Sequence, residues 1–141
     1  MSTESMTTKP KIQLKGMNHF GLNVKDMARS EKFYSEILGF PVIYRTATKS
    51  GNKHIEVDVG NVAIALFESP DLDFESAQKV FTEEGYLHFA FTTTKDKFEG
   101  ILQELKDQNV KIDGDPRIYG SGASAYFFDP DGHHLEIHYD E

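Results

Sequence analysis

The stretch MNHFGLNV, residues 17–24, alternates large apolar side chains with small or polar ones. In an extended chain the apolar set points one way and His19 points the other way. The stretch YLHFAFT, residues 86–92, repeats this alternation with His88 in the corresponding place. Each stretch is typical of a strand that packs its large apolar residues under a helix and presents its histidine, flanked by small residues, on the opposite face.

Both strands begin the same order of elements. The first is followed by Asp26 as a helix cap, an amphipathic helix and a stop at Gly39. Turn residues and apolar runs then separate three strands in each half. We predict helices at 27–38 and at 94 or 95 to 107, and further strands near 40–47, 54–59, 61–67, 111–118, 123–128 and 133–139.

The chain therefore reads as two βαβββ modules, an α+β class. Module 1 covers about 16–68 and module 2 about 86–139, joined by a linker at about 69–85. We expect residues 12–141 to form a single domain, and residues 1–11, which are polar and lack periodicity, to form a disordered tail.

Composition excludes several classes of function. Acidic residues outnumber basic ones by 23 to 15, the net charge is −8, and no basic stripe is present, so nucleic acid and anionic membranes are not expected partners. No long apolar run or signal segment appears, which favours a cytoplasmic protein. Cysteine is absent, which leaves His, Asp and Glu as the metal ligands.

The last strand supplies a third candidate ligand, Glu136. Leu135 and Ile137 take the helix side of this strand, so His134, Glu136 and His138 face the same way as the two strand-opening histidines. Two neutral imidazoles and one carboxylate hold a divalent transition metal and leave coordination positions open for a substrate. We therefore predict that His19, His88 and Glu136 are metal ligands.

Four stretches resemble the vicinal oxygen chelate superfamily, which includes glyoxalase I, fosfomycin resistance proteins, extradiol dioxygenases and bleomycin-binding proteins. The resemblance implies that the modules form a cup-shaped sheet around a divalent metal (Fe, Mn, Ni or Zn), frequently in a homodimer whose sites take ligands from both chains. It also implies that the metal binds a small vicinally oxygenated substrate and stabilises an oxyanion. The stretches are MNHFGLNVKD at 17–26, FYSEILGF at 33–40, LHFAF at 87–91 and YFFDPDGHHLEIH at 126–138.

The residues distinguish among the branches of this family. Glyoxalase I carries a fourth ligand near the end of module 1, where Glu68 is nearest, but Glu68 shares the helix-facing parity of Leu66, so we predict a surface glutamate. The fosfomycin group carries a small hydroxyl residue where this chain has Gly21, and an arginine beyond the last strand that has no counterpart before Glu141. Extradiol dioxygenases share the metal ligands and keep a cavity tyrosine at the place of Tyr126.

Further polar residues are candidates for substrate contact. Tyr126 is the candidate for binding substrate, and His54 or Glu56, on the inner face of module 1, for proton transfer. His134 and His138 are either partners of the ligands or solvated strand-end residues. The loop at 119–122 has the glycine content of a lid, with an ordinary turn as the alternative. Phe74, Phe81 and Tyr86 either cover the cavity mouth or pack at a dimer interface.

These observations favour a metal-dependent enzyme, lyase- or transferase-type, of the glyoxalase/bleomycin resistance/dioxygenase superfamily. An Fe(II) extradiol-type dioxygenase is one alternative. A small-molecule (drug) binding protein without turnover is the other.

Overall fold

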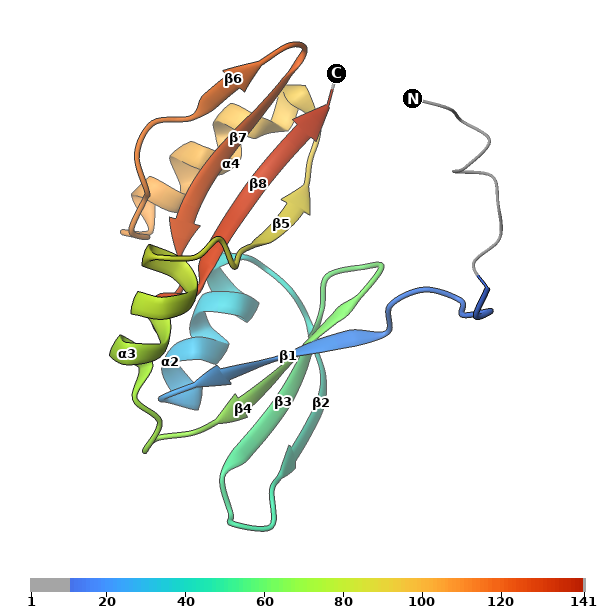
Figure 1. Cartoon of the computed structure of the whole chain (residues 1–141), viewed down its shortest axis with the longest axis vertical. Helices are drawn as coiled ribbons and strands as arrows, with labels where there is room; N and C mark the ends of the chain where they lie inside the picture. Colours follow the sequence, from blue (N-terminus) through green and yellow to red (C-terminus); the bar gives the residue numbers. More distant parts are fainter. Residues whose placement is uncertain (1–10, 141) are drawn as a thin grey trace.

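The computed structural model describes residues 11–140, in which the strands form two four-stranded sheets of identical topology (Figure 1). One edge pair in each sheet is parallel, β1–β4 in the first and β5–β8 in the second. The other strand pairs are antiparallel. The predicted duplication and the α+β class are confirmed. In spatial order the sheets are β1 (His19–Val24), β4 (Ala63–Glu68), β3 (Lys53–Asp58), β2 (Val42–Ala47), and β5 (Phe89–Thr92), β8 (His134–Asp140), β7 (Gly122–Phe128), β6 (Arg117–Tyr119).

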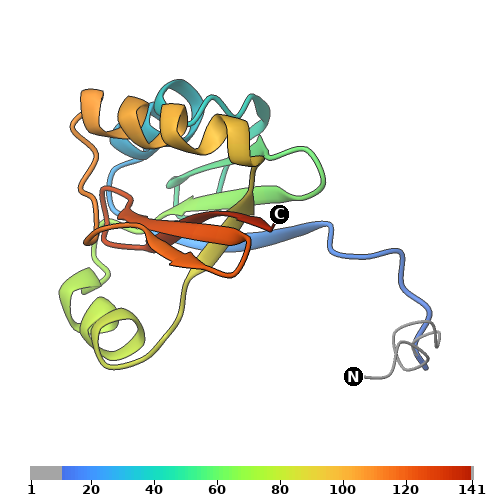
Figure 2. The ribbon, with the colours of Figure 1, turned by 90° about the horizontal axis from the view of Figure 1, so that it is seen from above.

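Helices cover one face of both sheets (Figure 2). In module 1, α2 (Met27–Glu31) continues into a π-helical turn, η1 (Lys32–Ile37), and Gly39 follows with φ +80°. In module 2, α4 (Lys95–Asp107) has the predicted end and one of the two predicted starts. Asp26 caps α2 by accepting a hydrogen bond from Arg29 N at 3.2 Å, as predicted.

The linker contains a helix that the sequence analysis left without an assignment. Here α3 (Phe74–Gln78) continues into η2 (Lys79–Glu83), and Figure 2 shows this segment on the side of the sheets opposite α2 and α4. Asp73 caps α3 by accepting hydrogen bonds from the backbone N–H (3.1 Å) and hydroxyl (2.7 Å) of Ser76. No helix in residues 11–140 is long and apolar enough to cross a membrane.

One hydrophobic core joins the two modules. The inward parity predicted for the strands holds, because Leu22, Val24, Leu135 and Ile137 are all buried beneath the helices. Aromatic rings pair across the modules: Phe20 stacks on Phe89 with centroids 4.8 Å apart. Phe40 contacts Phe91 at 5.5 Å and Phe33 contacts Phe127 at 6.4 Å. The shared core fixes the relative positions of the two sheets.

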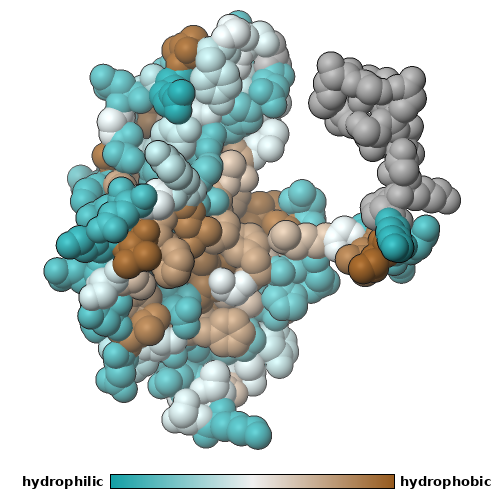
Figure 3. Space-filling view, viewed as in Figure 1, coloured by the Kyte–Doolittle hydropathy of each residue, from teal (hydrophilic) through white to brown (hydrophobic). Residues whose placement is uncertain are grey.

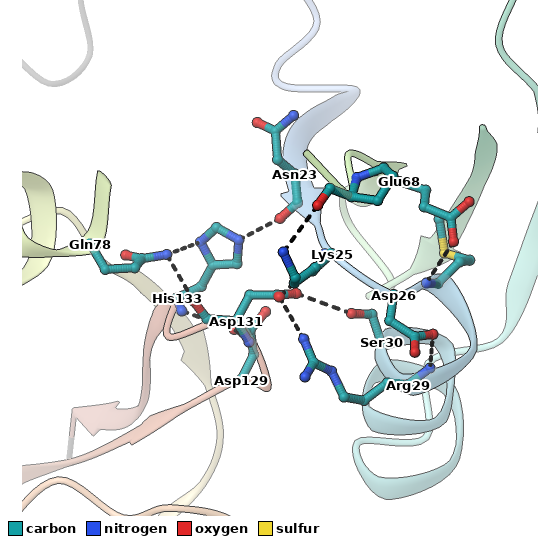
Figure 4. A network of polar contacts seen from close by, with 12 residues as sticks. Asn23, Lys25, Asp26, Arg29, Ser30, Glu68, Gln78, Asp129, Asp131 and His133 are labelled. Atoms are coloured by element: carbon teal, nitrogen blue, oxygen red, sulfur yellow. Dashed lines mark hydrogen bonds and ion pairs between the residues drawn. The ribbon is translucent and has the colours of Figure 1, made fainter. Parts of the chain in front are cut away.

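A polar network fixes the turn at 129–132 against the start of α2 (Figure 4). Asp131, which is buried, accepts hydrogen bonds from Lys25 N (3.2 Å), Arg29 (2.7 Å) and the Ser30 hydroxyl (3.3 Å). Because a buried carboxylate is stable only when donors surround it, these contacts tie module 2 to module 1 specifically. Tyr34, two turns further along, donates to Asp129 at 2.7 Å.

Several predicted boundaries are corrected. The predicted strand near 111–118 reduces to β6, with an isolated bridge between Ile112 and Phe127. The strand predicted from residue 86 begins at Phe89, so His88 precedes β5, whereas His19 opens β1. The predicted tail falls outside the described residues except for Lys11.

Candidate metal site

Two of the three predicted ligands meet in module 2. His88 Nε2 lies 3.2 Å from Glu136 Oε1, on the sheet face opposite α2 and α4 (Figure 2), which we call the open face. Ligands bonded to one cation at about 2.1 Å, with an angle of roughly 90–110° between them, lie about 3.0–3.4 Å apart. The separation of these two atoms therefore fits two bonds to a single metal ion. Glu136 is buried while the His88 side chain is 41% exposed, so the pair is open to solvent on one side.

His19 and His88 each direct ring nitrogen Nδ1 toward a nearby carbonyl oxygen. His88 Nδ1 donates to the Tyr86 carbonyl oxygen at 2.7 Å, since a carbonyl oxygen only accepts. His19 Nδ1 likewise faces the Asn18 side-chain carbonyl at 2.6 Å. A neutral imidazole that donates through Nδ1 carries its lone pair on Nε2, which is the form that binds a metal. Local contacts thus prepare each ring as a ligand.

A single chain does not assemble the predicted triad. Across residues 11–140, no three His, Asp or Glu side chains lie together in a group that would hold a metal ion. His19 is exposed, together with Gly21 and Asn23, on the open face of β1. Within the described residues of one chain, His88 and Glu136 therefore meet without His19, and we call this pair the half-site.

Glu68 makes its hydrogen bonds to the start of α2 and the start of β3, not to His88 or Glu136. Its Oε2 accepts from Met27 N at 3.1 Å, at the start of α2, and its Oε1 accepts from Lys53 N at 3.2 Å. The predicted helix-side orientation is thus present, and the carboxylate links the end of β4 to two neighbouring elements. Ala65, which pairs with Gly21 in the β1–β4 register, is buried, and its methyl side chain cannot bind a metal.

Aromatic rings line the open face beside the half-site. Tyr126 pairs with Glu136 across β7 and β8, and its ring lies edge-on to His88 with centroids 6.4 Å apart. His134 stacks on Tyr126 at 5.3 Å and on Phe128 at 5.0 Å, and its Nε2 contacts Asp113 at 2.9 Å. His134 is therefore held in an aromatic stack, whereas Tyr126 borders the half-site, and its contact with substrate stays a prediction.

The candidate bases lie on the open face of module 1. Ile55 and Val57 are buried in the core, so His54 and Glu56 point to the other side of β3, as predicted. Glu56 pairs with Ala65, which in turn pairs with Gly21, so small residues adjoin its carboxylate. His54 stacks on Phe67 with centroids 4.0 Å apart.

The two candidate bases are close to each other but are not hydrogen-bonded. His54 Nε2 is 4.0 Å from Glu56 Oε2, beyond hydrogen-bond distance. Among the buried side-chain polar atoms of residues 11–140, His54 Nε2 is the one without a partner.

Ser124, which the sequence analysis did not connect to the site, contacts Glu136 directly. The buried Ser124 donates to Glu136 Oε2 at 2.6 Å, and Tyr119 and His138 adjoin the Ser124 hydroxyl. Tyr119, from the loop predicted as a lid or turn, is therefore anchored to the sheet by its hydroxyl. The alternation of side chains in β7 could have indicated Ser124, because Ser124 lies on the same face of the strand as Tyr126. In the β7–β8 register, Ser124 pairs with His138 and Tyr126 pairs with Glu136.

The surface around His19 and His88 is apolar. Figure 3 shows apolar side chains gathered between the two sheets on this face. Met17, which is 67% exposed, lines a cavity of about 640 Å³ together with His88 and Phe89. Phe81 (56% exposed) and Leu87 (50% exposed) line a neighbouring hollow that reaches Gly21 and Asn23. Exposed apolar side chains that gather on one face are typical of a contact with another molecule.

Known proteins share this architecture and much of this sequence. Glutathione transferase FosA of Serratia marcescens is 33% identical over 125 residues, covering 89% of this chain and 81% of the relative. Metallothiol transferase FosB of Staphylococcus haemolyticus is 32% identical over 126 residues, covering 89% and 84%. The crystal structure of the fosfomycin resistance protein FosX from Listeria monocytogenes matches with a TM-score of 0.73 and 25% identity, covering 92% of this chain and 96% of that chain.

The predicted divalent metal cofactor, whose identity stays open, is confirmed by the comparison with these relatives. FosX from Listeria monocytogenes has also been crystallised with Mn(II) and a sulfate ion, a structure that matches this chain with a TM-score of 0.70 and 24% identity and covers 92% of this chain and 95% of that chain. A family model described as the Glyoxalase/Bleomycin resistance protein/Dioxygenase superfamily matches residues 16–137. The chain belongs to this superfamily.

Proposed function

We propose that this protein is a metal-dependent enzyme, of transferase or hydrolase type, that acts on a small vicinally oxygenated molecule. The main support is the half-site on the open face, where His88 Nε2 and Glu136 Oε1 are separated by a distance that suits two ligands of one metal ion. We further propose that His19 of a second copy completes the site, so that a symmetric homodimer holds two sites. The names of the relatives, two transferases and a fosfomycin resistance protein, support this class.

Three features support a second copy as the source of His19. His88 and Glu136 form a half-site that lacks a third ligand among the described residues. His19 lies on an open strand face, with its Nε2 available for binding. Apolar side chains exposed around both histidines would be buried by a partner, which would contribute roughly 25 cal/mol per Å² of apolar area. A two-fold axis that brings β1 of one copy to the half-site of the other produces two identical sites.

The residues present suit polar addition chemistry. The bound metal would polarise a substrate oxygen and stabilise the negative charge that develops on it. Tyr126 would orient the substrate beside Glu136. Glu56 would come from the same copy as His19, and its strand neighbours are small residues. It would accept a proton from the attacking nucleophile. His54, packed against Phe67, is less suited to that transfer.

The shared site is tested with two variants that carry different tags. H19A and E136Q are co-expressed, and complexes that carry both tags are isolated and loaded with Mn(II). One of their two sites is intact, with His19 from the E136Q chain and His88 and Glu136 from the H19A chain. About half of the wild-type metal content is therefore expected, whereas either variant alone should bind none.

The outcomes separate the competing arrangements. Metal-free mixed complexes would contradict a shared site, and metal retained by both single variants would contradict the triad. E99Q, which alters an exposed glutamate of α4, serves as a control and should keep full metal content. With Mn(II)-loaded protein, addition of water or a thiol to small vicinally oxygenated substrates should depend on Glu56. Uptake of O₂ on catechols would instead indicate a dioxygenase, and ligand binding without turnover a binding protein.

A further inference from the structure

The carboxylate of Glu136 has two oxygens in different surroundings. Oε1 faces His88 Nε2 at 3.2 Å, whereas Oε2 accepts a hydrogen bond from the Ser124 hydroxyl at 2.6 Å. Glu136 and Ser124 are both buried, so water does not compete for this bond. A short bond from a buried hydroxyl to a carboxylate is among the stronger hydrogen bonds in proteins. One oxygen is thus occupied before any metal binds.

Two more side chains fix the Ser124 hydroxyl. His138 stands directly opposite Ser124 in the β7–β8 register, with Nδ1 2.9 Å from Oγ. The Tyr119 hydroxyl contacts both Ser124 Oγ and His138 Nδ1, the latter at 2.7 Å. The Tyr119 ring also stacks on the His138 ring, with centroids 5.8 Å apart. On its outer side, His138 Nε2 contacts Asp140 at 2.9 Å.

We infer that Ser124, supported by Tyr119 and His138, is a positioning residue that restricts Glu136 to binding the metal through Oε1 alone. This inference rests on the proposed function. A carboxylate that binds through one oxygen takes one coordination position, whereas a bidentate carboxylate takes two. Three ligands that each use one position leave sites open for two neighbouring oxygens of a substrate. Ser124 therefore preserves the vacancy that chelation of a vicinally oxygenated substrate requires.

The test compares S124A with S121A, which makes the same change in an exposed loop residue. Mn(II) affinity is measured by calorimetry, and the electron paramagnetic resonance spectrum reports the ligand arrangement. For S124A we expect affinity to fall about 10- to 100-fold and the spectrum to change, because Oε2 is released. S121A should match wild type. Unfolding midpoints of the metal-free proteins show whether S124A is folded.

Each outcome has a distinct meaning. Wild-type affinity together with a wild-type spectrum in S124A would overturn the positioning role and leave the proposed metal site intact. Absence of Mn(II) binding by wild type would overturn both. If S124A does not fold, Y119F decides, because the Tyr119 side chain is partly exposed and only its hydroxyl is removed. A roughly three- to tenfold lower affinity is then expected, and unchanged affinity refutes the inference.

Discussion

Gly122, the first residue of β7, permits a close approach that no other residue type tolerates. A Cβ built on Gly122 would lie 2.5 Å from the Tyr139 carbonyl oxygen of β8. That is roughly 0.8 Å inside the distance of about 3.3 Å at which carbon and oxygen ordinarily touch. Because the obstructing atom is backbone in a paired strand, G122A must displace the start of β7. Overpacking of this kind costs about 2–3 kcal/mol.

The assay is urea and thermal unfolding of metal-free protein at one fixed concentration. At about 3 °C per kcal/mol for a chain of this size, G122A should lower the Tm by roughly 6–9 °C. Because Ser124 is two residues further along β7, Mn(II) affinity should fall as well. G100A is the matched control: a Cβ there meets nothing within 4 Å on α4, so removing a helical glycine should stabilise by about 0.5–1 kcal/mol. A G122A variant as stable as wild type would refute the steric argument.

Two further predictions concern the buried hydrogen bond between Tyr34 and Asp129. Y34F keeps the volume of a fully buried ring but removes a donor to Asp129, so it should cost about 1–3 kcal/mol in urea unfolding; no loss would mean that the bond is dispensable. Burial raises the pKa of Asp129, so the folded chain retains a proton that the unfolded chain releases. Wild-type stability should therefore decline relative to D129N as pH rises from the ordinary aspartate range through that raised pKa, by at most about 1.4 kcal/mol per pH unit. Equal pH profiles for the two proteins would contradict this assignment.

The alternation of apolar residues was sufficient to predict which face of each strand is buried. Leu22, Leu135 and Ile137 lie in the core and His88 and Glu136 on the open face, because a strand has only two faces. The parity of Glu68 likewise predicted its orientation toward the helix side, where its carboxylate accepts a hydrogen bond from Met27 N. The order of elements within each module followed from two copies of one pattern, which supplied mutually consistent evidence for a single topology.

Other features depend on interactions that periodicity does not encode. The helix at 74–83 has no buried residue, so it lacks the apolar stripe by which an amphipathic helix is found. The first helix continues into a π-helical turn, η1, in which the adjacent side chains of Phe33 and Tyr34 are both buried, and the alternation of apolar residues does not predict this change of helix type. All three residues of the short β6 strand belong to the exposed class, so no alternation of buried and exposed residues marks it.

The alternation of side chains predicts the sheet face on which a residue lies, but not which part of the molecule or of a second copy that face contacts. His19 and His88 occupy equivalent places in two modules whose shared core, through Phe20 and Phe89, keeps the sheets side by side rather than face to face. Under the proposed arrangement the missing ligand comes from a second copy, and metal binding and dimer formation then become linked equilibria. Each must strengthen the other by the same factor, since only the dimer contains all three ligands. Duplication within the chain places one histidine at the start of each module, and under the proposal two-fold symmetry between chains would bring these histidines together.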